Sequence, residues 1–269
     1  MDLIDRPSPN YDDRALGVSM IVLHYTGMPD CQGAIDRLTS PEAKVSAHYC
    51  VDEDGTVYRL VDEAKRAWHA GKSYWRGVTD INSASVGIEI VNPGHEFGYR
   101  AFPDDQIAAL IPLVADIKER HGIGRGNIVG HSDVAPDRKD DPGELFPWWE
   151  LAKRRLALPS PSRDLIDPFW TDAGFLLALE RFGYDVADPQ KSVIAFQRRF
   201  RPDLIVGEIA IAELMAWVDD FNADAGAIDV GGSAPARFAR VPRALVFIDQ
   251  PVNAAVFIDQ IMARHLGLG

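Results

Sequence analysis

Two largely apolar segments that each end at a histidine constrain the fold of this chain most strongly. Residues 18–23 and 127–130 have the length and composition of buried strands, and His24 and His131 follow them directly. If the two strands lie near each other in one sheet, the imidazoles meet at the ends of the strands. A carboxylate beside them would complete a set of ligands that binds zinc and leaves one position open for water.

The loop that begins at His131 and runs to Gly143 carries the chemistry that such a site needs. It contains several aspartates and a lysine within a few residues of the histidine. The simpler interpretation is that His131 and Asp133 only cap local turns, as single histidines and aspartates commonly do. The loop alone does not decide between a metal site and a turn, because a short motif needs its structural context.

The hydrophobic pattern predicts an α/β fold with a central mixed β-sheet flanked by helices. Asp52–Gly55 is a good hairpin turn between two short strands. The segment from Pro103 to His121 has apolar residues at helical spacing, and Gly122 follows where the helix should stop. Strands are expected at residues 18–24, 49–51, 56–61, 85–91 and 127–130, and a further helix at 31–39.

Composition agrees with a globular enzyme and argues against some partners. The 269 residues are 46% hydrophobic and 25% charged, which is enough for one large domain and a small one. The net charge of −12 argues against nucleic acid as a partner, because phosphate binding needs an extended basic surface. No stretch reaches the roughly 18 to 20 apolar residues of a membrane span. No feature of the sequence indicates an oligomeric state.

The cysteines and the first residues bear on the compartment. Cys31 and Cys50 are the only two cysteines, too few for a disulfide framework, so we expect free buried thiols in a reducing compartment. The first residues are acidic and lack the pattern of a secretory signal. We therefore expect a cytoplasmic protein, with the periplasm or cell envelope as the alternative.

Five ordered segments between about residues 15 and 155 resemble one enzyme family. They resemble the zinc-dependent N-acetylmuramoyl-L-alanine amidases of type 2, the AmpD/AmiD-like family. Each short segment alone is weak, but five in the right order are highly specific. The segments are Leu23–Thr26, Ser46–Tyr49, Ala67–Gly71, Ser85–Glu89 and His131–Gly143.

The resemblance implies an amidase site built on zinc. Zinc bound by His24, His131 and Asp141 would activate a water and polarise the scissile carbonyl. Glu89 is implied as the general base, and strand alternation sends it to the face opposite Ile88 and Ile90. Lys139 is implied as the cation beside the oxyanion. The simpler interpretations are an edge carboxylate for Glu89 and a surface salt bridge for Lys139.

The implied reaction is hydrolysis of the amide between the lactyl group of N-acetylmuramic acid and L-alanine. The substrate would be peptidoglycan or an anhydro-muropeptide in cell-wall turnover or recycling. We assign His48, Trp68, His69, Tyr74 and Trp75 to substrate contacts, with support behind the metal ligands as a further role for the two histidines. Alternatives are a non-catalytic peptidoglycan-recognition protein on the same fold and a metallopeptidase that cuts within the stem peptide.

The chain beyond the amidase-like part suggests a second, helical unit. Helices are expected after Thr171, around Val193–Gln197 and over Ile209–Val218. Together they resemble a small three-helix peptidoglycan-binding domain, although its usual Asp-Gly-x-x-Gly-Pro turn is missing; the alternative is a stabilising appendage. The expected organisation is a catalytic domain at 1–157, a linker at 158–163, the three-helix domain at 164–222 and a tail without an assigned role at 223–269.

Overall fold

The computed structural model describes residues 3–160 and 172–202. The chain divides into two compact units, Met1–Pro159 and Ser160–Gly269. The expected third helix at Ile209–Val218, the tail at 223–269 and the expected cap Thr171 lie outside the described residues. No helix in the described part of the chain is long and apolar enough to cross a membrane.

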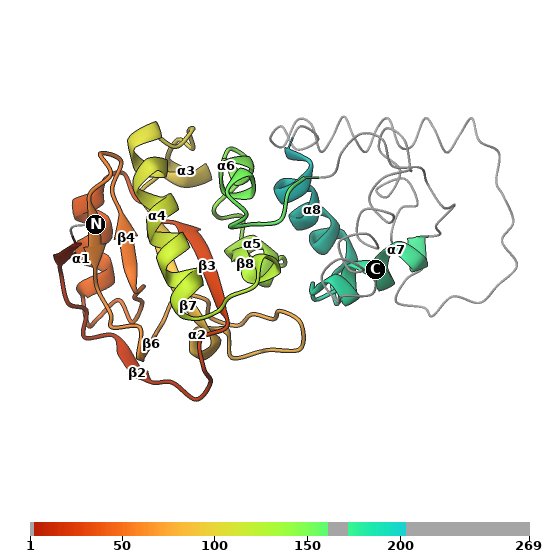
Figure 1. Ribbon diagram of the computed structural model, residues 1–269, viewed down its shortest axis with the longest axis horizontal. Helices are drawn as coiled ribbons and strands as arrows, with labels where there is room; N and C mark the ends of the chain where they lie inside the picture. The colour runs from red at the N-terminus through yellow and green to blue at the C-terminus, as the bar shows by residue number, and fades with distance from the viewer. Residues whose placement is uncertain (1–2, 161–171, 203–269) are drawn as a thin grey trace, which may run out of the picture. The chain divides into compact units, whose positions relative to one another are not determined.

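The first unit is built on a six-stranded mixed sheet in the order β1-β5-β4-β7-β3-β8 (Figure 1). All neighbouring strands are parallel except β4 and β5, which pair antiparallel around the expected hairpin turn. A separate two-stranded sheet joins β2 and β6. The strands are β1 (Leu3–Asp5), β2 (Tyr11–Asp13), β3 (Met20–Tyr25), β4 (Tyr49–Val51), β5 (Val57–Arg59), β6 (Lys65–Ala67), β7 (Ser85–Ile90) and β8 (Ile128–Gly130).

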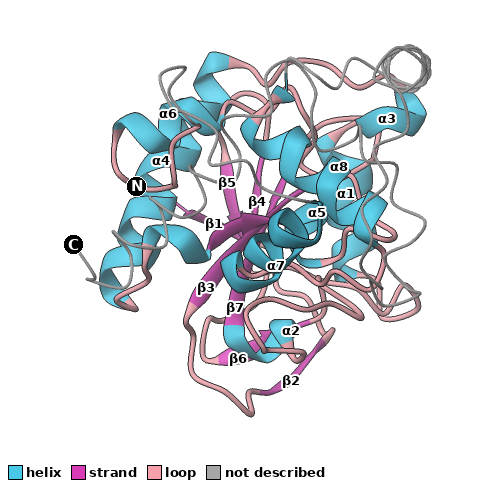
Figure 2. Ribbon diagram, turned by 90° about the vertical axis from the view of Figure 1, so that its right-hand side faces the viewer, coloured by secondary structure: helices cyan, strands magenta, loops and turns pink. Residues whose placement is uncertain are grey.

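Helices cover both faces of this sheet, as the sequence predicted. Figure 2 shows α4 and α1 on opposite sides of the strands, and each contributes to a separate apolar cluster. β3 is buried on both faces and reads as a nearly continuous apolar run, whereas β7 alternates Ser85, Gly87 and Glu89 with Val86, Ile88 and Ile90. The helices of this unit are α1 (Cys31–Thr39), α2 (Ile81–Ala84), α3 (Gly94–Phe97), α4 (Asp104–Arg120), α5 (His131–Val134) and α6 (Trp148–Lys153).

Helix α4 fixes one face of the sheet through apolar and polar contacts. Its buried residues include Leu110, Val114 and Ile117, which share one side of the helix. Gln106 is fully buried and its amide donates to the backbone carbonyls of Val51 and Val91, so it joins the ends of β4 and β7. The helix therefore holds the strand ends that border the candidate site.

In the second unit the structure describes two helices, α7 (Asp172–Phe182) and α8 (Pro189–Phe200). Asp188 caps α8 by accepting a hydrogen bond from the backbone N–H of Lys191. Phe182 packs edge-on against Phe196 and Phe200, so the two helices share an aromatic core.

Candidate active site

Parallel strands bring the candidate residues to one edge of the sheet. In the register of β3 with β7, His24 lies beside Glu89, and in the register of β3 with β8, Leu23 lies beside Gly130. His131 follows Gly130 directly and begins α5. The carboxyl ends of three neighbouring strands thus deliver a carboxylate and two imidazoles to the same place.

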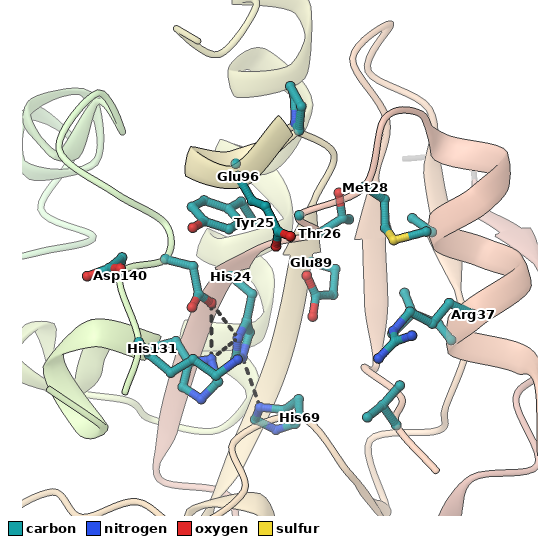
Figure 3. Close-up of a pocket in the computed structure, with 18 of the residues that line it drawn as sticks. His24, Tyr25, Thr26, Met28, Arg37, His69, Glu89, Glu96, His131 and Asp140 are labelled. Carbon is teal, nitrogen blue, oxygen red and sulfur yellow. Dashed lines mark hydrogen bonds and ion pairs between the residues drawn. The ribbon is translucent and has the colours of Figure 1, made fainter. Parts of the chain in front are cut away.

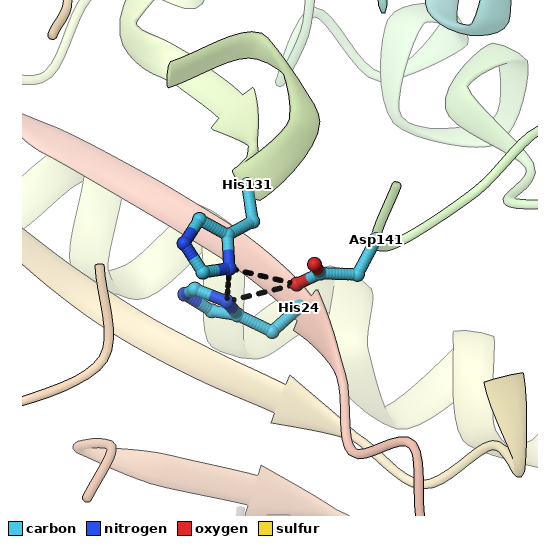
Figure 4. Close-up of side chains that lie close together, drawn as sticks. All are labelled: His24, His131 and Asp141. Carbon is cyan, nitrogen blue, oxygen red and sulfur yellow. Dashed lines mark hydrogen bonds and ion pairs between the residues drawn. The ribbon is translucent and has the colours of Figure 1, made fainter. Parts of the chain in front are cut away.

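His24, His131 and Asp141 converge on one point. The two Nδ1 atoms are 2.9 Å apart, and each lies 3.0 Å from Oδ2 of Asp141 (Figure 4). All three residues are at most 5% exposed. They are the single group of three or more potential metal ligands in the described part of the chain.

The hydrogen bonds around His131 show which ring atom carries its lone pair. Nε2 of His131 lies 3.1 Å from the carbonyl oxygen of Ala70, and a carbonyl can only accept, so Nε2 carries the proton. In the neutral ring Nδ1 is then a lone pair, and it faces the Asp141 oxygen, which is also an acceptor. Two hydrogen-bond acceptors 3.0 Å apart repel each other unless a cation lies between them. This pair of lone pairs therefore fits a metal ion.

The protonation of the other two groups agrees with a metal site. Burial, helped by His131, lowers the pKa of His24 to about 4, so its ring is neutral at neutral pH. Burial alone would raise the pKa of Asp141, but its contacts with His131 and His24 hold it well below its usual range. A neutral imidazole and an ionised carboxylate are the forms that bind metals.

The loop that carries Asp141 is held from two sides. The backbone carbonyl of Asp141 accepts from the N–H of Ser132, and the Tyr99 hydroxyl donates to the carbonyl of Pro142 at 2.9 Å. Gly143 has a φ of 86°, and a side chain there would overlap the Tyr99 ring. These contacts fix the direction of the carboxylate.

Glu89 is placed as a base beside the metal ligands. Its Oε2 is buried and has no hydrogen-bond partner among the residues that the structure describes. Burial first, and the nearby Asp141 second, raise the pKa of Glu89 well above its ordinary value, while Lys139 and Arg37 oppose the rise. A carboxylate with an unused lone pair on a pocket wall can accept a proton.

These groups line a cavity of about 570 Å³. Figure 3 shows Glu89 between the cluster of His24 and His131 on one side and Arg37, which comes from α1, on the other. Lys139 also lines the cavity. A substrate in this cavity meets a proton acceptor, candidate metal ligands and the cationic side chains of Arg37, Arg138 and Lys139.

Asp133 fits the simpler interpretation, whereas His131 does not. Oδ2 of Asp133 accepts a hydrogen bond from the backbone N–H of Gly130 at 2.7 Å, so this carboxylate supports the local turn. His131 instead points its ring at His24 and Asp141.

The residues expected to contact substrate are only partly brought to the cavity. Trp68 and His69 line it. Trp75 is 1% exposed and belongs to the core, and His48 is completely buried, where it bridges the N–H of Gly87 and the carbonyl of Lys65. Neither residue lines the cavity, and a contact of either with substrate stays a prediction.

Tyr74 does not line the cavity either. Its backbone N–H donates to the carbonyl of Val134, and the following residues form a tight turn in which Trp75 pairs with Val78. Its assignment to substrate contact stays a prediction.

Sequence reasoning gave no role to Ser85, Gly87 or Arg37. Ser85 and Gly87 lie on the same face of β7 as Glu89, because alternate residues of a strand share a face. The alternation that located Glu89 could therefore have located them. No sequence pattern pointed to Arg37, because a charged residue on a helix is usually exposed to solvent.

Comparison with known proteins finds that this chain is similar to a family of amidases. A family model described as N-acetylmuramoyl-L-alanine amidase matches residues 14–144. N-acetylmuramoyl-L-alanine amidase AmiD of Escherichia coli K12 is 39% identical over 226 residues, which are 74% of this chain and 80% of AmiD. The 1,6-anhydro-N-acetylmuramyl-L-alanine amidase AmpD of Citrobacter freundii is 32% identical over 178 residues, 59% of this chain and 92% of AmpD.

Solved structures of amidases resemble this chain as well. The structure of E. coli AmiD in complex with the substrate anhydro-N-acetylmuramic acid-L-Ala-D-gamma-Glu-L-Lys aligns with a TM-score of 0.62 at 36% identity, over 72% of this chain and 85% of that one. AmpDh3 of Pseudomonas aeruginosa aligns with a TM-score of 0.61 at 30% identity, over 77% of this chain and 94% of that one.

Proposed function

The chain belongs to the N-acetylmuramoyl-L-alanine amidase family, and we propose that it is a zinc hydrolase acting on muropeptides. It cleaves the amide bond between the lactyl group of N-acetylmuramic acid and L-alanine in cell-wall recycling. One observation of the site carries the proposal: three metal-binding acceptors converge within 3.0 Å beside a buried carboxylate with an unused oxygen.

His24, His131 and Asp141 would hold the zinc ion, and their donor atoms are those of catalytic zinc sites. When bound, the ion supplies Lewis acidity, which polarises the scissile carbonyl and makes water a stronger nucleophile near neutral pH.

The protein side chains then transfer protons and stabilise charge. Glu89 takes a proton from the attacking water as the new C–O bond forms, and its raised pKa suits it to keep that proton until the amine departs. Lys139 lies on the cavity wall, where its ammonium can stabilise the negative charge that develops on the carbonyl oxygen. Glu89 returns the proton to the L-alanine nitrogen, so the C–N bond breaks with a neutral amine as product.

The position of Arg37 supports a muropeptide as substrate. The stem peptide carries free carboxylates, and Arg37 on the wall opposite the metal ligands offers a guanidinium to one of them. The AmiD structure contains anhydro-N-acetylmuramic acid attached to such a peptide, and we propose a soluble anhydro-muropeptide for this chain as well.

The first experiment is to incubate the zinc-loaded protein with an anhydro-muropeptide and, separately, with purified sacculi, and to identify the products by mass spectrometry. Glu89→Gln, with its zinc content measured, is the matched control. We expect wild type alone to release a peptide that begins with L-alanine.

Two other outcomes would reject the proposal in different ways. New termini within the stem peptide would indicate a peptidase. Binding of muropeptide without cleavage by fully zinc-loaded wild type would indicate a recognition protein.

A further inference from the structure

A third histidine stands behind one of the metal ligands. Nδ1 of His69 lies 3.0 Å from Nε2 of His24, on the side of the ring that faces away from Asp141 (Figure 3). Nε2 of His69 lies 3.2 Å from the hydroxyl of Ser85, and that hydroxyl lies 2.6 Å from the carbonyl oxygen of Ile81. Four groups therefore form one continuous chain of hydrogen bonds.

The direction of each hydrogen bond follows from the group at the end of the chain of bonds, the carbonyl of Ile81. The Ile81 carbonyl can only accept, so the single hydroxyl proton of Ser85 points to it, and the Ser85 oxygen must accept from Nε2–H of His69. Nδ1 of the neutral His69 ring is then a lone pair that accepts from Nε2–H of His24. This leaves Nδ1 of His24 without a proton, and it is the atom that faces His131 and Asp141.

We infer that Ser85 and His69 are positioning residues that set the tautomer and direction of His24 for the metal ion. The inference rests on the proposed function, because it concerns the same ion. A hydrogen bond to the distal nitrogen fixes the tautomer and orientation of a metal-binding histidine and increases its basicity as a ligand.

The two histidine ligands are supported in different ways. His131 is oriented by the backbone carbonyl of Ala70, which no substitution removes. His24 depends on side chains, and the support of its tautomer can therefore be removed by mutation at Ser85 or His69 while every metal ligand is kept.

Gly87 makes this arrangement possible. The His69 ring lies against the backbone of β7 at Gly87, and a Cβ atom there would overlap the ring. On one face of the strand, Ser85 therefore supports His69, Gly87 leaves space for its ring, and Glu89 reaches the cavity.

The first test is the affinity for Zn²⁺, measured by competition with a chelating dye. We expect Ser85→Ala and His69→Ala to weaken zinc binding by roughly 10- to 100-fold, the usual effect of losing a partner behind a metal ligand. Ser8→Ala is the matched control, because Ser8 is also buried and also donates a 2.6 Å hydrogen bond to a backbone carbonyl, that of Leu38, but touches no histidine of the site. Its zinc affinity should equal that of wild type.

The second test reads the tautomer directly, in wild type, and does not depend on whether any variant folds. In the zinc-loaded protein with ¹⁵N-labelled histidines, NMR should show His69 protonated at Nε2 and unprotonated at Nδ1. A proton on Nδ1 of His69, or wild-type zinc affinity in both folded variants, would overturn the inference. If wild type itself binds no zinc, the proposed function fails instead, so the two failures are distinguishable.

Discussion

Glu89 is the residue whose ionisation should limit the reaction at acidic pH. A general base must be ionised, and the pKa of Glu89 is raised above the ordinary 4.5 by burial and by Asp141. We therefore expect kcat/KM on a soluble muropeptide to keep rising with pH well above 4.5, because the fraction of ionised Glu89 keeps rising. A pH profile of the zinc-saturated enzyme checks this, and a plateau reached already near pH 4.5 contradicts it.

Lys139 should act on the transition state more than on substrate binding. Replacing it with methionine removes the ammonium from the cavity wall and keeps most of the side chain's volume. We expect kcat to fall by about 10²- to 10³-fold with a smaller change in KM and unchanged zinc content, as for the loss of one oxyanion donor. Lys153→Met on α6, whose ammonium lies over the Trp149 ring, is the control that should retain wild-type kinetics. Equal losses in both variants would argue against this role.

For single residues, the sequence predicted those that carry distinctive chemistry. His24, His131, Asp141, Glu89 and Lys139 were all named from their motifs, and all border the same cavity. The motifs could not separate Trp68, which lines the cavity, from Trp75, which is core, because two aromatic residues in neighbouring turns have the same local pattern. The part played by Ser85 depends on the Ile81 carbonyl and on His69 from a distant loop, which only the folded chain brings together.

Among the elements, β7 carries Ser85, Gly87 and Glu89 on one face, beside His69 and the cavity. Gly87→Ala keeps every hydrogen-bonding side chain but pushes the His69 ring away from His24. We expect weaker zinc binding and a loss of about 1–3 kcal/mol of stability from overpacking. Thermal unfolding of the metal-free protein and zinc titration measure the two effects separately. Gly17→Ala is the control, because nothing lies within 4 Å of a Cβ atom there, and its zinc affinity and stability should stay close to those of wild type.

A second interaction between elements ties the end of α4 to the sheet. Glu63, in the turn between β5 and β6, accepts from Arg120, from the Tyr49 hydroxyl at 2.6 Å and from His121. Burial alone would raise the pKa of Glu63, but these three partners together lower it to about 2. A depressed pKa means that the contribution to stability is complete above the ordinary 4.5 and is lost as pH falls toward 2.

We expect Glu63→Gln to destabilise the protein by about 1–2 kcal/mol near neutral pH, because it removes the charge that these partners contact. The loss is no larger because Arg120 is 44% exposed, and solvent weakens its ion pair with Glu63. The difference between variant and wild type should shrink as pH falls from 4.5 toward 2. Urea unfolding at several pH values measures it. Asp13→Asn, whose carboxylate is 89% exposed in its pair with Lys65, should cost far less, and a pH-independent effect of Glu63→Gln would contradict the assignment.

The sequence predicted the long periodic elements and also the short strands β4 and β8, whose residues are all buried. The strands around His24 and Glu89, the hairpin at Asp52–Gly55 and the helix after Pro103 were confirmed within a few residues. The three-residue strands β1, β2 and β6 and the one-turn helices α2, α3 and α5 were missed. Elements this short repeat their hydrophobic pattern at most about once, and the positions of these strands depend on partners far along the chain.

For the whole molecule, the residues that we propose as catalytic all lie in the first unit. Relatives such as AmpD match only 59% of this chain yet align over 92% of their own length. We expect a chain that ends at Pro159 to bind zinc and to cleave soluble anhydro-muropeptide at a rate within about tenfold of the full chain, as for independent domains. Loss of zinc binding in the shortened chain, with its circular dichroism unchanged, would argue against an independent first unit.

The same pair of proteins tests the second unit. If the expected three-helix domain at 164–222 binds peptidoglycan, as its resemblance to a peptidoglycan-binding domain suggested, the full chain should cosediment with sacculi and the shortened chain should not. Equal cosedimentation would favour a stabilising role. The comparison needs inactive Glu89→Gln versions of both, so that cleavage does not release the protein during the measurement.

The wide spacing of the ligands along the chain has a consequence for synthesis. His24 and Asp141 are 117 residues apart, and His131 precedes Asp141 by only 10. Between His24 and His131 a ribosome-bound chain therefore exposes a single one of these ligands, and the last two become available almost together, after every strand of the six-stranded sheet has been made. An ion that needs all three ligands cannot be captured tightly by an incomplete product, so metal uptake reports that synthesis of the catalytic unit has reached its end.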